Sequence, residues 1–229
     1  RNAASTFNMS SGSLTLDNTG QYWDVTLGNF AVATYNQSGG TAVFNAGEVD
    51  VANNAGSGGT SINVSGGNFT IAGTAGTPNK KLILGVRGNA SFNINSTANV
   101  TIPDFLFGHS SGVASTATLN LDGGTLLTQR LSISNGTAIL NLNGGLLKAS
   151  ADNTSFLSGL TTTNVRNGGA RFDTNAHDVP IAQALVHSTI GGDAATDGGL
   201  VKSGAGKLVL TGSSDFNGDT AVNEGTLQV

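Results

Sequence analysis

The 229-residue sequence predicts an all-β fold, a parallel β-helix (β-solenoid) of about eight or nine coils. Three observations favour this fold class. A short phrase recurs along the chain, apolar and polar residues alternate within each copy, and Gly-Gly or Asn-Gly pairs follow many of the copies. A repeat of roughly 20 to 30 residues with an internal period of two is typical of stacked β-coils. A sandwich of hairpins is the alternative for short strands with glycine turns.

Each copy of the phrase contains an asparagine between apolar residues, then a glycine pair or a close substitute. The copies begin at Phe7, Tyr35, Ile62, Phe92, Leu119, Leu140 and, more loosely, Asn164. The two most similar copies are 117–121 and 138–142. Their superposition places one alanine on an alanine and two leucines on two leucines. Because alternate side chains of a strand point to opposite faces, we expect Leu119 and Leu121 to face the core and Asn120 to face outward.

The connections between the strands are predicted from glycine and proline. Asn135-Gly136, Asn143-Gly144 and Asn167-Gly168 can supply corners with positive φ. The longer coils contain insertions at 72–79 and 107–115, which we expect to be loops on one side. The segment 180–186 begins with a proline and could form a helical turn, but its β-branched residues favour a strand.

Composition limits the classes of function. The chain has 34 glycines, no cysteine, 10% charged residues and a net charge of −4. It therefore has no disulfide or thiolate metal site, and no basic stripe for nucleic acid or an anionic membrane. Hydrophobic residues make up 38%, enough for a continuous core, yet no stretch is apolar enough to insert in a membrane. Residues 1–5 lack the apolar region of a signal peptide, so we expect a mature or excised piece of a longer protein.

The C-terminal segment, from Gly198 to Val229, contains a recognisable motif. It reads GGLVKSGAGKLVLTGSSDFNGDTAVNEGTLQV, and the motif positions are Gly198, Gly199, Leu200, Lys202, Gly204, Gly206, Asn223, Gly225, Thr226 and Leu227. This segment resembles the autotransporter-associated β-strand repeat, also called the passenger-associated transport repeat. Asp219 and Glu224 stand where the family has small residues. The resemblance is specific from about position 165 onward and implies a right-handed β-helix, export and an autotransporter-like passenger, but no particular activity.

The predicted organisation is one continuous solenoid, with irregular coils in residues 1–165 and coils carrying the family repeat in residues 166–229. We expect a non-catalytic structural segment at a bacterial cell surface or in a secreted protein, acting as a passenger stalk or fibre subunit. The final strand, 226–229, needs a partner on its outer edge. We expect that partner to be a further coil of a longer chain or another copy stacked head to tail.

Two other classes of function remain open. A glycan- or surface-binding adhesin would need exposed aromatic side chains, for which Tyr22 and Trp23 are the candidates, although sealing of the first coil is favoured for them. A polysaccharide-active enzyme would need converging acids. The densest polar group holds Arg171, Asp173, His177 and Asp178, but a turn capped by Asp173 and Asn175 explains it more simply.

The remaining polar residues give no cofactor or metal site. Residues 215–219 place oxygen ligands at alternate positions, but the glycine and glutamate of a calcium-binding loop are replaced by Thr220 and Thr226, so a turn is predicted. We expect His109 and His187 to be isolated surface residues. Ice binding would need outward threonines aligned on successive coils, and we expect no such alignment, even at Thr161-Thr162-Thr163.

Overall fold

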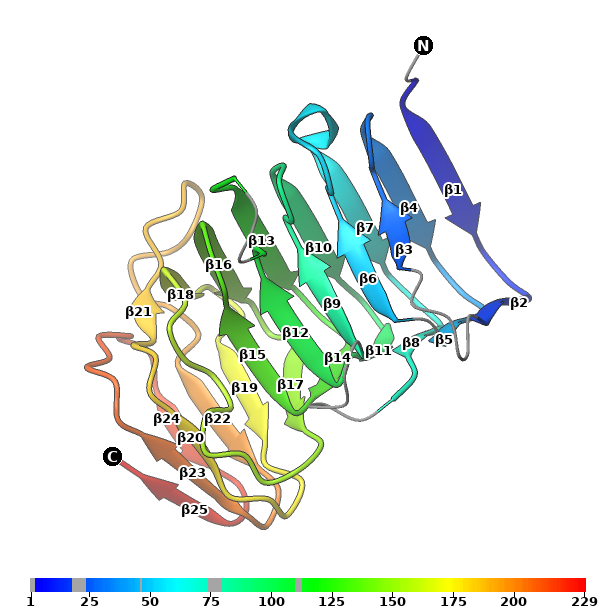
Figure 1. Ribbon diagram of the computed structural model, residues 1–229. Coiled ribbons are helices and arrows are strands. Elements are labelled where there is room, and N and C mark those ends of the chain that lie inside the picture. The colour runs from blue at the N-terminus through cyan, green and yellow to red at the C-terminus, as the bar shows by residue number, and fades with distance from the viewer. Residues whose placement is uncertain (1–2, 18–23, 46, 74–79, 110–112) are drawn as a thin grey trace.

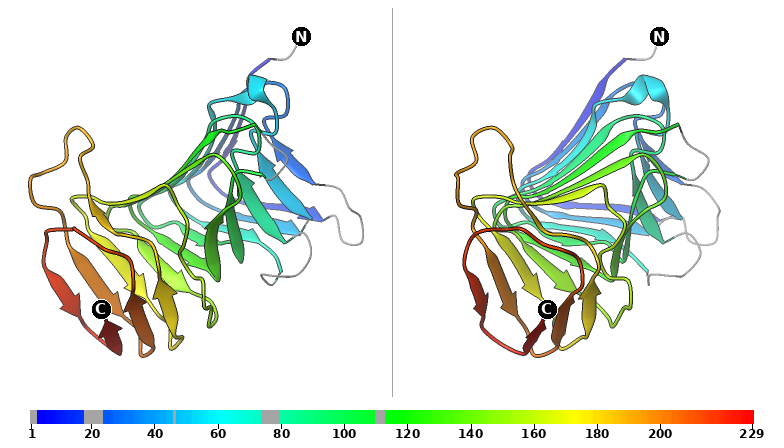
Figure 2. Two further views of the ribbon diagram at one scale, coloured as in Figure 1. Left: turned by 60° about the vertical axis from the view of Figure 1, so that its left-hand side comes forward. Right: turned by 90° about the vertical axis from the view of Figure 1, so that its left-hand side faces the viewer.

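The computed structural model describes residues 3–17, 24–45, 47–73, 80–109 and 113–229, which form a parallel β-solenoid of about seven turns (Figure 1). Every strand pair within the described residues is parallel and joins neighbouring turns, so the hairpin sandwich is wrong. Figure 2 shows the same stacking from two further sides. The all-β solenoid is confirmed, whereas its right-handed winding and its eight or nine coils stay predictions.

Each turn contributes strands to three faces, called here sheets A, B and C. Sheet A contains, in order, β1 (Ser5–Met9), β4 (Ala33–Gln37), β7 (Thr60–Val64), β10 (Ala90–Ile94), β13 (Thr116–Leu121), β16 (Thr137–Leu142), β18 (Thr162–Val165) and β21 (Val186–His187). Sheet B contains β2 (Ser13–Asp17), β5 (Thr41–Asn45), β8 (Asn68–Ile71), β11 (Asn99–Thr101), β14 (Thr125–Thr128), β17 (Leu146–Ala149), β19 (Ala170–Asp173), β22 (Leu200–Ser203) and β24 (Thr220–Val222).

The third face is divided in two. Sheet C contains β3 (Val25–Leu27), β6 (Glu48–Val51), β9 (Lys81–Leu84), β12 (Asp104–Phe107) and β15 (Arg130–Ile133), and a short sheet contains β20 (Val179–Ile181), β23 (Lys207–Leu210) and β25 (Thr226–Gln228). Leu157 bridges the two parts, pairing with Leu131 and Ile181. The face is therefore continuous along the solenoid.

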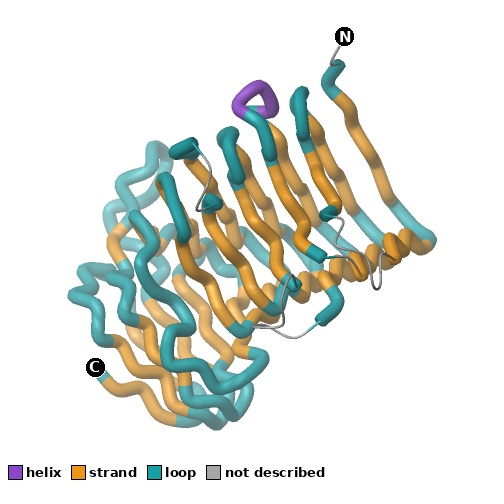
Figure 3. The backbone as a smooth tube through the Cα atoms, viewed as in Figure 1, coloured by secondary structure: helices purple, strands orange, loops and turns teal. Residues whose placement is uncertain are grey.

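Helix is scarce in the described chain. Figure 3 shows strands joined by loops along the whole solenoid, and the short 3₁₀ helix η1 (Ala55–Ser57) in the N-terminal half. Asn54 caps that helix by accepting a hydrogen bond from the Gly56 amide at 3.3 Å. No helix in the described ranges has the length and apolarity needed to cross a membrane.

The core follows the alternation in the sequence. Leu119 and Leu121 pair in register with Leu140 and Leu142, and all four are fully buried. An aromatic column also runs through the N-terminal coils, with neighbouring ring centroids 4.9 to 6.3 Å apart. Its members are Phe7, Tyr35, Phe44, Phe69, Phe92, Phe105 and Phe107. The predicted core positions are confirmed.

An amide ladder runs along the outer side of sheet A. Each side-chain Nδ2 donates to the Oδ1 of the asparagine one turn earlier, over 2.6 to 2.8 Å. The ladder consists of Asn8, Asn36, Asn63, Asn93, Asn120, Asn141 and Asn164. These are the asparagines of the recurring phrase, so the outward placement of Asn120 is confirmed.

The corners agree with the sequence prediction except at one position. Gly136 and Gly144 have positive φ, 82° and 91°, as expected. At the third corner Gly169, with φ 76°, takes this conformation in place of Gly168. Gly168 is needed for a different reason, because a Cβ there would lie 2.5 Å from the backbone of Asn143.

The two uncertain segments of the sequence prediction have different outcomes. Residues 179–181 form strand β20 and residues 186–187 form strand β21, but residues 182–185 belong to no strand or helix. The helical turn is therefore wrong, and the strand predicted for 180–186 is confirmed only at its two ends. Within the insertions, residues 72–73, 108–109 and 113–115 belong to no strand, as expected of loops. Residues 74–79 and 110–112 lie outside the described ranges.

Candidate functional site

The C-terminal coils place a lysine in the interior of the solenoid. Lys202 lies on β22, in register with Phe172 of the preceding coil and Val222 of the following coil. It therefore continues the core-facing row of sheet B, and its side chain is fully buried. An ammonium group in such a place is costly unless hydrogen bonds replace the lost water.

The Lys202 ammonium has four hydrogen-bond partners in three successive coils. Nζ donates to Thr174 Oγ1 at 3.0 Å, to the Ser203 and Gly204 carbonyl oxygens at 2.9 and 2.6 Å, and to the Glu224 carbonyl oxygen at 2.9 Å. Burial lowers the pKa of Lys202, and the carboxylates of Asp173 and Glu224 oppose that shift. The group acts as a cross-link between coils, built from one charge and four oxygens.

The glycines of this segment form the turns that bring those carbonyls inward. Gly199, Gly204 and Gly225 have φ of 68°, 77° and 71°, which disfavours any side chain. Gly206 lies so close to the preceding coil that a Cβ would be 1.9 Å from the His177 carbonyl oxygen. Leu200 is fully buried beside Lys202 on the same strand.

Comparison with protein-family models assigns this segment. Residues 200–229 match the model of the passenger-associated-transport-repeat. The C-terminal coils carry a passenger-associated-transport repeat. Such repeats occur in autotransporter passengers, which implies a secreted or surface location. No curated protein and no solved structure matched the chain.

The transport repeat ends in two short strands. Thr226 and Leu227 lie on β25, whose residues pair in register with Lys207 and Leu208 of β23. The backbone amide of Asn223 donates to the Lys202 carbonyl oxygen at 2.8 Å. The motif residues predicted to be structural therefore form the turns, the coil-to-coil pairing and the lysine cross-link of one region.

Directly before the transport repeat, Asp197 is a second polar centre. Its carboxylate accepts hydrogen bonds from the backbone amides of Gly199, Asn217 and Gly218, each at 2.9 Å. The Nδ1 of His187 lies 2.9 Å from Asp197 Oδ2. Burial alone would raise the pKa of Asp197, but these hydrogen bonds together hold it below its ordinary value.

The two histidines predicted to be isolated surface residues lie in different surroundings. His187 lies on β21 and contacts Asp197, so the prediction that it is isolated is wrong. The residues are ten apart in sequence, and the loop between them folds back to bring them together. His109 follows β12, outside any strand, and is half-buried.

The polar group at residues 171–178 divides among separate partners. Asp173 pairs with Lys148 at 2.9 Å and accepts a hydrogen bond from the Asn175 amide at 2.7 Å, which confirms the capped turn. His177 Nδ1 lies 3.2 Å from Asp152, Asp178 accepts a hydrogen bond from the Lys207 amide, and Arg171 is exposed. The four side chains do not share one contact network.

Residues 215–219 also form structural contacts. Asp215 Oδ1 accepts a hydrogen bond from the His187 amide at 2.9 Å. Asn217 Oδ1 accepts one from the Asp197 amide, also at 2.9 Å. Within the described ranges, no group of three or more acidic or histidine side chains could hold a metal ion. The turn is confirmed by these contacts.

A buried carboxylate in sheet C was not predicted from the sequence. Asp50 on β6 is 7% exposed, and its Oδ1 has no hydrogen-bond partner. Burial raises the pKa of Asp50 to about 7, assisted by the charges of Asp24 and Glu48 and opposed by those of Lys81 and Arg87. The carboxylate destabilises the fold when it is ionised.

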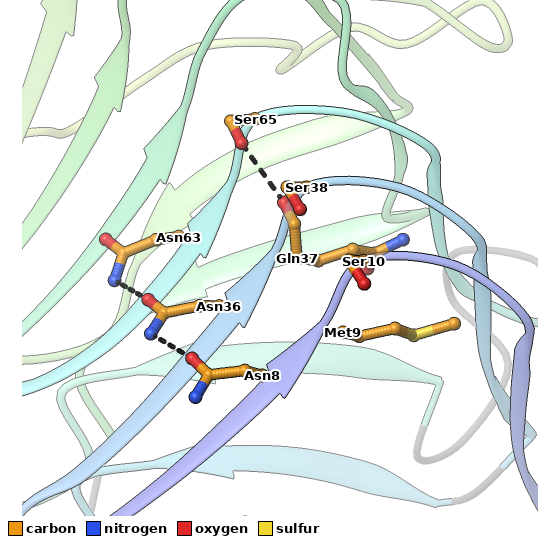
Figure 4. Close-up of a pocket in the computed structure, with 8 residues that line it drawn as sticks. All are labelled: Asn8, Met9, Ser10, Asn36, Gln37, Ser38, Asn63 and Ser65. Carbon is orange, nitrogen blue, oxygen red and sulfur yellow. Dashed lines mark hydrogen bonds between the residues drawn. The ribbon is translucent and has the colours of Figure 1, made fainter.

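The predicted glycan-stacking residues Tyr22 and Trp23 lie outside the described residues. A hollow of about 230 Å³ lies on another part of the N-terminal coils, along the amide ladder (Figure 4). Its lining residues are Asn8, Met9, Ser10, Asn36, Gln37, Ser38, Asn63 and Ser65. Sequence reasoning placed the asparagines on the outer face but not this hollow.

A row of hydroxyl groups on sheet A was not predicted from the sequence, although Thr6 and Thr34 are the one pair of threonines on successive coils within it. Thr6, Thr34, Ser61, Ser91, Thr118 and Thr162 occupy one row on the outer side of sheet A, interrupted by Ile139. Unequal coil lengths hide this register in the linear sequence. The position of each residue relative to its ladder asparagine, always two places before it, is the signal that could have revealed the row.

Proposed function

We propose that the chain is a non-catalytic structural segment of an autotransporter passenger, a stalk or fibre section at a bacterial surface. The transport repeat and its implied secreted or surface location support this proposal. The contacts of the functional candidates support it too, because the lysine, the aspartates and the asparagines join one coil to the next.

The amide ladder and the backbone pairing together carry the proposal. Seven ladder asparagines connect seven successive strands of sheet A, and every one of those strands pairs in parallel with its neighbour. A solenoid of this kind is quasi-one-dimensional, so each coil is held by its neighbours and a load along the axis is shared between them. Such a segment suits a spacer.

Single-molecule pulling tests the proposal. Because the chain has no cysteine, a cysteine added at each end gives two unique attachment points. A load-bearing solenoid should resist extension and then unfold in steps of about one coil. Each step should lengthen the chain by roughly 70 to 110 Å, the extended length of one coil. Smooth extension at low force, without steps, would contradict a structural role.

Self-association is part of the same proposal. In the described residues β1 pairs only with β4, and β25 only with β23, so their outer edges are where a second copy or further coils of a longer chain would pair. We expect head-to-tail association of the isolated chain. Light scattering after size exclusion should show a mass that rises with concentration, and a constant monomer mass up to high concentration would refute stacking.

A further inference from the structure

We propose that the outer face of sheet A binds a neutral linear polysaccharide, seated first in the hollow beside Asn36. This goes beyond a structural role, since it assigns a ligand class to one face of the solenoid. The proposal rests on three features of that face: parallel polar rows, a hollow between two of them, and the absence of charge in the lining of the hollow.

Three polar rows follow the solenoid axis on this face. The hydroxyl row contains Thr6, Thr34, Ser61, Ser91, Thr118 and Thr162. The amide ladder lies two positions further along each strand, and a third row of serines, Ser10, Ser38 and Ser65, follows two positions after that. Neighbouring strands are about 4.8 Å apart, so each row repeats its hydrogen-bonding groups at that interval, except at Ile139 of the hydroxyl row. A linear polysaccharide also presents its hydroxyl groups at regular intervals along one direction.

The hollow lies between the amide ladder and the serine row. Figure 4 shows Asn8, Asn36 and Asn63 in line on one side, with Ser38 and Ser65 on the other. Its volume of about 230 Å³ is below the range of sites for drug-sized molecules. It therefore fits one sugar unit of a longer chain that continues along the rows.

The amides are oriented before any ligand binds. Asn36 Nδ2 donates to Asn8 Oδ1, and Asn63 Nδ2 donates to Asn36 Oδ1, both at 2.8 Å. A primary amide has a second N–H and its oxygen has a second lone pair, which the ladder does not use. All the ladder amides point the same way, so the N–H groups and oxygen lone pairs that the ladder does not use have the same orientation on each coil. A sugar hydroxyl can accept a hydrogen bond from such an N–H group and donate one to such an oxygen.

The charge of the lining selects the kind of polysaccharide. The eight residues that line the hollow are amides, serines and one methionine, with no ionisable group. An anionic glycan would need lysine or arginine here, and a cationic one would need a carboxylate. Charged residues enter the continuation of the serine row only at Asp122 and Arg166, which pair with each other at 3.9 Å in later coils. A neutral chain is the complementary ligand.

Affinity electrophoresis tests the proposal with defined probes. The whole chain would run through gels that contain hydroxyethylcellulose, xylan or mannan, and through gels that contain polygalacturonate. The double variant Ser38→Leu/Ser65→Leu removes two exposed hydroxyl groups and narrows the hollow without touching the ladder. Asn99→Leu, at an exposed position of sheet B, is the matched control. Circular dichroism would check that all three proteins are folded.

We expect retardation by at least one neutral polysaccharide, about tenfold weaker in the double variant and unchanged in Asn99→Leu. Tenfold corresponds to the loss of roughly one or two hydrogen bonds. No retardation by any neutral probe, retardation by polygalacturonate alone, or equal retardation of the double variant would overturn the proposal. So would thermal hysteresis of ice growth that the double variant abolishes, since ordered water would then be the ligand. Because pulling tests the structural role separately, either proposal can fail alone.

Discussion

The N-terminal coils and the C-terminal coils solve the same stacking problem with different chemistry. From Tyr35 to Phe107 an aromatic column fills the interior through apolar ring contacts, and the half-exposed Phe7 stacks on its N-terminal end. In the transport repeat the interior row instead contains Lys202, whose ammonium joins three coils through oxygen atoms. The first solution is non-directional and tolerates variation, whereas the second depends on a set of fixed hydrogen bonds.

This difference explains why only one of the two regions has a recognisable sequence. Carbonyl oxygens reach the Lys202 ammonium only if the turns at Gly204 and Gly225 have positive φ. Those turns fix residue types at definite spacings, so residues 200–229 match a family model. Apolar packing accepts many residue types of about the right size. The earlier coils therefore share only the alternation of apolar and polar residues and the asparagine of the recurring phrase.

The largest effect is expected from Lys202→Ala. The change leaves a cavity and removes the donor from three carbonyl oxygens and one hydroxyl group, so the free energy of unfolding should fall by about 5 kcal/mol. Urea titration followed by circular dichroism measures the loss. Lys148→Met, which removes a partly exposed ion pair with Asp173, should cost less than about 1 kcal/mol. Equal losses of unfolding free energy in both variants would show that the Lys202 cross-link stabilises the fold no more than a partly exposed ion pair does.

Phe69→Ala tests the other side of the comparison. Phe69 is fully buried, and its ring centroid lies 4.9 to 5.8 Å from those of Tyr35, Phe44 and Phe92. Removing its ring should cost about 4 kcal/mol, because a large cavity opens in the column. Phe30→Ala, at a position that is 60% exposed, should change stability by less than about 0.5 kcal/mol. A small loss for Phe69→Ala would mean that the column relaxes around the cavity.

Asp50→Asn should stabilise the N-terminal coils, and only above acid pH. The folded protein raises the pKa of Asp50 from 3.8 to about 7, so the folded state holds a proton that the unfolded state has lost. The contribution of Asp50 to the unfolding free energy of the wild type is therefore fully present below about pH 4, and it is lost as the pH rises towards 7.

The Asp50→Asn variant does not titrate at this position. Its advantage in unfolding free energy should grow between pH 4 and 7 to about 2 to 4 kcal/mol, and thermal melts across that range measure it. The exposed Asp219→Asn is the control and should follow the wild type. A constant difference at all pH values would refute the buried ionisation.

The smallest effect is expected in the amide ladder. Asn93→Ala removes one donated and one accepted hydrogen bond, to Asn63 and from Asn120, both 2.6 Å. Because these amides are partly exposed, water replaces much of the loss, and we expect about 1 kcal/mol. Asn8→Ala, at the exposed end with one ladder bond, should cost half as much or less. The same urea titration compares the two variants. Equal losses of unfolding free energy would contradict a stabilisation that depends on the number of ladder hydrogen bonds.

Most of the fold could be predicted from local periodicity. The alternation around Leu119 and Leu121 and the matching phrase at Leu140 determine the facing of the strands and their register. The same rule could have placed Lys202 in the interior, because it lies two positions after the buried Leu200 on one strand. Lys202 was predicted only as a motif position, and its burial was not predicted.

Other features depend on contacts that the sequence does not encode locally. Packing between coils buries Asp50 and leaves its Oδ1 without a hydrogen-bond partner. The contact of His187 with Asp197 arises from a loop that folds back. The hydroxyl row on sheet A depends on register between coils of unequal length. The contacts of Asp50 and His187 have no fixed spacing, so periodicity could not reveal them, whereas each residue of the hydroxyl row lies two places before its ladder asparagine, which is a local signal.

Hydrogen exchange measured residue by residue in the wild type and in Lys202→Ala tests the central claim most directly. If the two regions are stabilised by separate devices in a quasi-one-dimensional fold, the variant should lose amide protection around residues 170–175 and 200–229. Protection in β7, β8 and β10, beside the aromatic column, should stay at the wild-type level. A uniform loss of protection along the whole chain would contradict the account.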